Sequence, residues 1–149
     1  MIRITQTYLI NFTITHYTHQ GWELLYKDLP GGRRSGMGQT ASINELWEGI
    51  YNLSPDILLY KDGNLLLFEV DSSLNSEYLN KLKKYKKKEN ELISRLEIIL
   101  NVKIDKIDYG FIAKSVQIPE SIPIDLYPFT YMGYDKETHT LKGKIYKTG

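Results

Sequence analysis

The middle of the chain combines short apolar runs with one long amphipathic stretch. Residues 57–60 (ILLY), 65–70 (LLLFEV) and 107–113 (IDYGFIA) are short and mostly apolar, which is typical of strands buried in a sheet. Asp62-Gly63 separates the first two runs, and Asp-Gly between apolar runs predicts a β-hairpin. The sequence therefore predicts a hairpin and a third strand at the centre of a sheet.

Apolar residues recur at helical spacing in three other segments. The first is 5–20, where a high threonine content leaves a strand as the alternative to the helix that we favour. The second is 43–51, where Glu45 lies three residues after Ser42 and completes a capping box. The third and longest is 74–100. We therefore expect three helices.

The longest helix connects two of the predicted core strands. Ser72 and Ser73 offer an N-cap for its first turn. A helix between residues 65–70 and 107–113 is a crossover connection, which joins parallel strands and is right-handed in nearly all proteins. We therefore expect these two strands to be parallel.

The remaining segments extend the sheet. Residues 22–26 predict a short strand, and residues 29–40, which contain GGRRSGMG, predict a glycine-rich loop. Residues 129–134 and 141–146 predict a terminal hairpin. The predicted order is α-β-α-β-β-α-β plus a C-terminal hairpin. This is an α/β fold with a mixed central β-sheet flanked by helices.

Composition narrows the class of protein. The chain has 149 residues and a formal net charge of +1, which fits a single domain spanning 1–149. It has no cysteine, which excludes disulfides, cysteine zinc sites and thiol nucleophiles. Without a long apolar stretch or a secretory signal pattern, we expect no membrane segment and a cytoplasmic location.

Three acids lie at the end of the predicted hairpin, residues 57–70, that is opposite its turn. Asp56 begins one strand, Glu69 ends the other, and Asp71 follows on the same face as Glu69. A carboxylate in an apolar strand such as that of Glu69 is costly to bury without a cation or a donor. Carboxylates and a backbone carbonyl, for which Val70 is the candidate, are ligands that Mg²⁺ prefers. Such an ion suits phosphodiester hydrolysis.

Pro55-Asp56, a hairpin and an apolar strand ending in Glu69-Val70 resemble the PD-(D/E)XK nuclease superfamily, whose members share a restriction-endonuclease-like core. The resemblance implies that Asp56 and Glu69 hold the metal, which is Mg²⁺ or Mn²⁺. It also implies a supporting acid on the preceding helix, for which Glu45 and Glu48 are candidates, with Glu48 nearer in sequence.

Position 71 departs from that family. Lys is usual there, whereas this chain has Asp71, which would assist the metal or the water. RecB-type nucleases carry Q-x3-Y on the following helix, and the matching residues here are Lys81 and Tyr85. Lys81 is therefore the candidate for a displaced catalytic lysine. In the alternative interpretation Asp56 begins a strand, Glu69 pairs with a lysine and Asp71 caps the next helix.

Two basic segments are candidates for contact with nucleic acid. Arg33 and Arg34 lie in the glycine-rich segment, and arginine binds phosphate with two donors at once. Lys84 belongs to a run of lysines on the long helix, which can follow phosphates. Both segments have an ordinary alternative as solvated surface.

Two functions follow from these features. The first is a small Mg²⁺-dependent nuclease that hydrolyses DNA through Asp56, Glu69 and Asp71, with Lys81 as the cation. The second is a catalytically degenerate relative that binds nucleic acid or a partner protein, such as a subunit of a mobile-element or defence system. The short chain favours assembly as a homodimer or with a partner subunit, with the terminal hairpin as the candidate interface.

Overall fold

A mixed β-sheet forms the middle layer of the computed structural model, which describes residues 4–30, 33–36, 45–47 and 54–148. Over these ranges the sheet has seven strands in the order β2-β1-β3-β4-β5-β6-β7. The strands are β1 (Glu23–Leu29), β2 (Arg33–Gly36), β3 (Ile57–Lys61), β4 (Asn64–Asp71), β5 (Lys106–Ala113), β6 (Phe129–Asp135) and β7 (Thr140–Tyr146). The pairs β4–β5 and β5–β6 are parallel, and the other pairs are antiparallel. The predicted α/β class and mixed sheet are confirmed.

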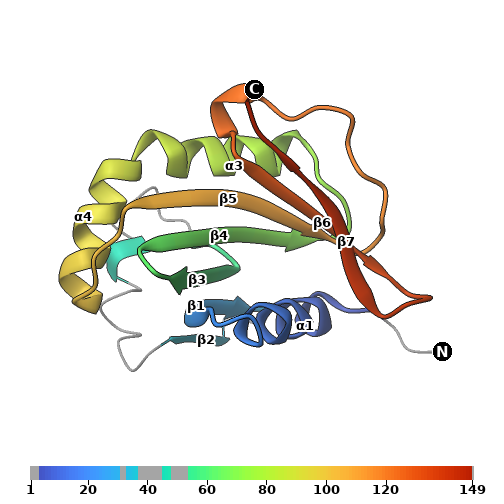
Figure 1. Cartoon of the computed structure of the whole chain (residues 1–149), viewed down its shortest axis with the longest axis horizontal. Coiled ribbons are helices and arrows are strands. Elements are labelled where there is room, and N and C mark those ends of the chain that lie inside the picture. Colours follow the sequence, from blue (N-terminus) through green and yellow to red (C-terminus); the bar gives the residue numbers. More distant parts are fainter. Residues whose placement is uncertain (1–3, 31–32, 37–44, 48–53, 149) are drawn as a thin grey trace.

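Helices cover both faces of this sheet. Figure 1 shows α1 (Gln6–Thr18) on one side, and α3 (Ser76–Lys87) and α4 (Glu89–Leu100) on the other. The turn η1 (Ile124–Leu126) contacts α3. None of the helices in the described part of the chain has the length and apolar content needed to cross a membrane.

Each face of the sheet has its own apolar core, because side chains alternate along a strand. In β4, Leu65 and Leu67 pack towards α3 and α4, in a core that includes Leu82, Tyr85, Leu92 and Leu96. Leu66, Phe68 and Val70 pack towards α1, in a core that includes Leu9 and Ile10. A nearly continuous apolar strand is thus explained by burial on both faces.

The predicted hairpin is present between β3 and β4. Asp62 and Gly63 form its two-residue turn, with φ angles of 49° and 85°. Positive φ at both central residues matches the twist of the flanking strands, which explains the preference for Asp-Gly here. The predicted parallel crossover to β5 and the terminal hairpin of β6 and β7 are also confirmed.

The prediction of one long helix over residues 74–100 was wrong in two respects. Lys88, with φ −103° and ψ 18°, separates it into α3 and α4. The N-cap is Asn75, whose side chain accepts from the Tyr78 N–H, rather than Ser72 or Ser73. Apolar periodicity continues through the break because both helices pack on the same core, so the pattern did not reveal it.

The predicted glycine-rich loop at 29–40 is partly a strand. Arg33–Gly36 forms β2, which pairs with the end of β1 as an antiparallel edge strand. β1 also runs to Leu29, three residues beyond the predicted end. Of the helix predicted at 43–51, residues 45–47 are described and are helical. Edge strands need one paired side only, so a polar, glycine-rich sequence can form one.

Candidate active site

The open end of the β3–β4 hairpin brings Asp56 and Glu69 together. Asp56 follows the buried Pro55 and immediately precedes β3, where Ile57 pairs with Phe68. Asp56 Oδ2 accepts from the Val70 N–H at 2.8 Å, and Glu69 Oε2 accepts from the Asp56 N–H at 3.3 Å. Each carboxylate therefore accepts a hydrogen bond from the backbone of the other residue's segment. The sequence predicted that the two acids lie at the same end of the hairpin.

Lys81 of α3 completes this cluster. Its Nζ donates to Glu69 Oε1 at 2.6 Å and to the Ser54 carbonyl at 2.9 Å. The side chain of Glu69 is 1% exposed, whereas that of Lys81 is 23% exposed. Lys81 thus links a buried carboxylate to the surface. An ammonium has three protons, and the third has no partner among the described residues.

Burial raises the pKa of both carboxyl groups. For Glu69 the loss of hydration is the largest cause, the charge of Asp56 adds to it, and Lys81 opposes it, so that the pKa rises to about 8. The pKa of Asp56 is also raised, mainly by burial, while the hydrogen bond from Val70 and the charge of Lys81 lower it. Both groups are therefore poised to favour a bound cation, since a cation offsets the cost of their ionisation.

Asp28 belongs to the same cluster and was missed by the sequence analysis. Its N–H donates to the Asp56 carbonyl at 3.0 Å, and its Oδ2 accepts from Ser54 Oγ at 2.6 Å. Its charge contributes to the raised pKa of Asp56. The end of β1 was predicted before this residue, and pairing between β1 and β3 is not local in sequence. No motif in the sequence could therefore have pointed to it.

Tyr85 is buried on α3, one turn after Lys81, and is close enough to the carboxylates to respond to their charge. Burial raises its pKa first, and the charges of Glu69 and Asp56 raise it further. Its buried hydroxyl has no hydrogen-bond partner among the residues that the structure describes. Lys81 and Tyr85, which are separated by three residues on the helix as in the Q-x3-Y motif, are thus both near the two acids.

Asp71 is oriented differently from the other two acids. Its Oδ1 accepts from the Ser72 N–H at 2.7 Å, and its Oδ2 accepts from the Tyr78 hydroxyl. The residue contributes charge that raises the pKa of Asp56, so it is near the cluster. Its hydrogen bonds fix the turn between β4 and α3. The N-cap of α3 is Asn75, so the alternative interpretation in which Asp71 caps this helix was wrong. Its role as a metal ligand stays a prediction.

The donor set suits a hard divalent ion held by two carboxylates. Mg²⁺ is usually bound by one or two carboxylates, with water and substrate oxygens completing the shell. Asp56 and Glu69 offer such a pair, and the ammonium of Lys81 shows that a cation fits beside them. The Val70 carbonyl accepts from Gln6 Nε2 at 2.9 Å, so one of its lone pairs is already used. Within the described residues no group of three or more His, Asp or Glu side chains is arranged to hold a metal.

The other predicted site residues lie as follows. Arg34 pairs with Asp28 in the β1–β2 register, and Arg33 pairs with Leu29, so the backbone of β2 runs beside the cluster. Lys84 is exposed on α3, one turn after Lys81. Glu48 lies outside the described residues. The alternative acid Glu45 is exposed and lines a hollow beside α4, and no described contact joins it to the carboxylates.

Comparisons with protein-family models, with curated proteins and with solved structures give no match for this chain.

Proposed function

We propose that the chain is a small metal-dependent nuclease that hydrolyses phosphodiester bonds of DNA. The observation that carries the proposal is the buried Glu69 carboxylate, which lies beside Asp56 and within 2.6 Å of the Lys81 ammonium. Two acids and a lysine supplied by three separate elements are unusual in a core layer. Their desolvation is costly, and a functional role is the common reason for such clusters.

Each residue has a role in this proposal. Asp56 and Glu69 hold Mg²⁺ or Mn²⁺, which when bound polarises a phosphate and lowers the pKa of a water molecule. Lys81 donates its third proton to a phosphate oxygen, where negative charge develops during hydrolysis. Ser54 and Asp28 hold the backbone that positions Lys81. Asp71 orders the start of the segment leading to α3.

The position of Lys81 supports the idea of a displaced lysine. The superfamily that the motif resembles has its lysine two residues after the second acid, where this chain has Asp71. Lys81 approaches the same acid from α3 instead. A restriction-endonuclease-like core is part of this proposal. The exposed Lys84 and the arginines of β2, Arg33 and Arg34, are proposed to bind the phosphates of DNA on either side of the site.

The first test is titration of Mg²⁺ and Mn²⁺ into the purified chain, followed by cleavage of supercoiled plasmid. Asp56→Asn and Glu69→Gln change each acid to a neutral residue of similar shape, and both are expected to lose metal binding and cleavage. Asp125→Asn alters an exposed acid of η1 and should behave as the unchanged chain does. Full cleavage by both site variants would refute the assignment.

A catalytically degenerate protein is the second candidate, and one observation favours it. Both oxygens of Glu69 already accept hydrogen bonds, one from Lys81 and one from the Asp56 N–H, so the acid is satisfied without a metal. Such a protein would bind DNA or a partner subunit with no metal requirement. Absence of metal binding, with DNA or partner binding retained in Glu69→Gln, would favour this function. The edge strand β7 is the proposed surface for a homodimer or partner.

A further inference from the structure

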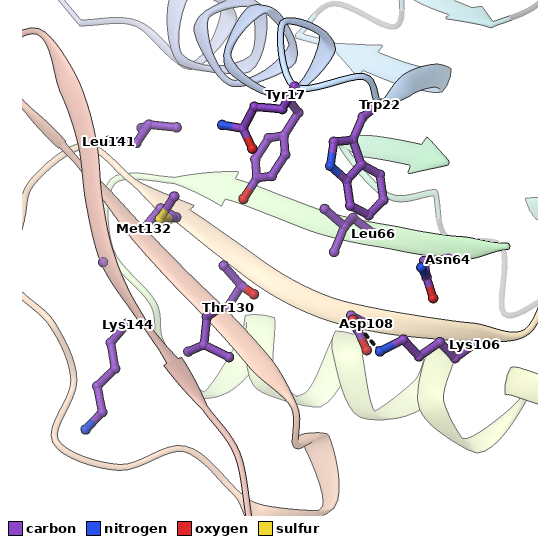
Figure 2. Close-up of a pocket in the computed structure, with 13 residues that line it drawn as sticks. Tyr17, Trp22, Asn64, Leu66, Lys106, Asp108, Thr130, Met132, Leu141 and Lys144 are labelled. Atoms are coloured by element: carbon purple, nitrogen blue, oxygen red, sulfur yellow. Dashed lines mark ion pairs between the residues drawn. The ribbon is translucent and has the colours of Figure 1, made fainter. Parts of the chain in front are cut away.

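A pocket of about 540 Å³ lies on the face of the sheet opposite Lys81. Figure 2 shows that residues of β4, β5, β6 and β7 form its floor, and that the end of α1 and the residues after it form one wall. Its volume is within the range that holds a small organic ligand. The carboxylate cluster is not part of its lining.

Tyr17 gives this pocket a hydrogen-bond donor. Only 8% of the residue is exposed, and its hydroxyl points into the pocket in Figure 2. Burial raises its pKa to about 12, so the hydroxyl keeps its proton and is available as a donor. No hydrogen bond joins it to any residue in the described ranges. The hydroxyl is therefore free to donate to a molecule in the pocket.

The floor of the pocket carries further polar groups in neighbouring strands. Asn64 of β4 and Thr130 of β6 present an amide and a hydroxyl, and Asp108 of β5 lies between these strands. Lys106 Nζ is 3.6 Å from Asp108 Oδ2, and Figure 2 marks this ion pair. The floor therefore offers acceptors, donors and a cation on one surface.

Apolar side chains complete the pocket. The partly exposed indole of Trp22 and the side chain of Leu66 lie on one side of the hydroxyl of Tyr17, and Met132 lies on the other. The rings of Trp22 and Tyr17 form a T-shaped pair with centroids 6.1 Å apart. Aromatic and thioether groups provide favourable contacts for a planar ring.

We propose that this pocket binds a mononucleotide, with the base between Trp22 and Met132 and the phosphate at Lys106. A purely apolar ligand would offer no acceptor to the Tyr17 hydroxyl and no negative charge to Lys106, and covering these groups without partners is costly. A simple anion would contact Lys106 but would make no use of the indole of Trp22 or the thioether of Met132. A base with donors and acceptors at its edge can contact the Tyr17 hydroxyl, and the phosphate joined to it can contact Lys106. This site is independent of the nuclease proposal.

The test uses adenosine 5′-monophosphate as the probe and the fluorescence of Trp22 as the signal. The chain has two tryptophans, and Trp47 is 1% exposed in the core on the other face. In Trp47→Phe the signal therefore comes from Trp22 alone, and saturable quenching by the nucleotide is expected. Isothermal titration of the unchanged chain gives the same affinity without a substitution, so the test stands if that variant does not fold.

Matched tyrosine variants then locate the ligand. Tyr17→Phe removes only the buried hydroxyl and should weaken nucleotide binding by about three- to tenfold, as expected for one hydrogen bond. Tyr60→Phe is the control, because its hydroxyl donates to the Lys103 carbonyl, outside the pocket. Asp56→Asn should bind the nucleotide as the unchanged chain does.

Three results would overturn the proposal. The first is no saturable binding of the nucleotide up to millimolar concentration. The second is an equal effect of Tyr17→Phe and Tyr60→Phe on affinity. The third is binding of inorganic phosphate as tight as that of the nucleotide, which would leave no role for the base. Weaker binding of phosphate and of adenosine than of the nucleotide supports it.

Discussion

The stability of the folded chain depends on the contact between Glu69 and Lys81, and this dependence can be measured. Glu69 is buried, and its nearest cation is Lys81, which is partly exposed. Lys81→Met keeps the length of the side chain but removes the ammonium, which leaves the buried Glu69 side chain with the Asp56 N–H as its remaining donor. We expect the free energy of unfolding to fall by about 1–3 kcal/mol, as measured by urea denaturation.

The metal proposal makes this variant informative in a second way. If a divalent ion binds at the same carboxylates, adding Mg²⁺ at about 5 mM should restore part of the stability that Lys81→Met loses. Lys84→Met, on the exposed side of α3, should lose little stability and gain nothing specific from Mg²⁺. Equal responses of the two variants would contradict the placement of the ion.

The raised pKa of Glu69 predicts how stability depends on pH. The folded chain holds the Glu69 proton up to about pH 8, whereas the unfolded chain releases it near its ordinary pKa of 4.5. The folded state therefore binds more protons between these values, so this group's contribution is fully present below pH 4.5 and is lost as the pH rises through 8. Asp56, whose pKa is also raised, acts in the same direction.

The measurement is urea denaturation in buffer with a metal chelator, at pH values on both sides of the raised Glu69 pKa of about 8. The unchanged chain should lose stability with rising pH, and Glu69→Gln should flatten that decline. Glu77→Gln, an exposed glutamate of α3, is the matched control and should keep the decline. The same slope in all three proteins would show that Glu69 titrates at its ordinary pKa.

At the scale of elements, the β3–β4 hairpin positions both acids, and its turn can be tested apart from them. Gly63 has φ 85°, and a Cβ there would clash with the Asp105 carboxylate. Gly63→Ala should lower the free energy of unfolding by about 1–3 kcal/mol, because the positive φ disfavours a side chain. Asp62→Gly, at the other positive-φ position, should cost far less.

A substitution at the turn of the hairpin is expected to leave metal binding at its other end unchanged. Asp56 and Glu69 lie at the end opposite the turn, so folded Gly63→Ala should bind Mg²⁺ as the unchanged chain does. Calorimetry well below the unfolding temperature checks this. Weaker metal binding in proportion to the lost stability would show that the site depends on the whole hairpin.

The sequence predicted the elements that have local signals. The Asp62-Gly63 turn and the apolar run of β4 gave the hairpin, and this hairpin gave the pairing of Asp56 with Glu69. The break at Lys88 was not predicted, because the residues on both sides keep helical periodicity. β2 was not predicted, because its stability comes from pairing with β1 and not from its own composition.

In the site, too, the sequence identified the residues that belong to a local motif and missed the residue that is brought in by pairing between distant strands. Lys81 was singled out from its position before Tyr85, and the structure brings it to Glu69 because α3 packs across β4. Asp28 was missed because its neighbour Asp56 is 28 positions away in sequence, on a strand whose pairing no motif announces. Pairing between distant strands is therefore the information that one sequence did not supply.

For the whole molecule, the sheet separates two chemical environments. The carboxylates and Lys81 lie on the face covered by α3 and α4, while the pocket of Tyr17 and Asp108 lies on the face covered in part by α1. Substitutions in one environment should leave binding in the other unchanged, since the β4 strand between them is fully buried from Leu65 to Val70.

The charge of the whole chain predicts how DNA binding depends on salt. A net charge of +1 gives little general attraction to DNA, so binding must come from local clusters such as the exposed lysines of α3. Neutralising one phosphate contact lowers the slope of log K against log salt by about one. Lys84→Gln should show this change in fluorescence anisotropy with labelled duplex DNA. Lys103→Gln, 86% exposed in the segment between α4 and β5, should keep the original slope. An unchanged slope in Lys84→Gln would place the DNA elsewhere on the molecule.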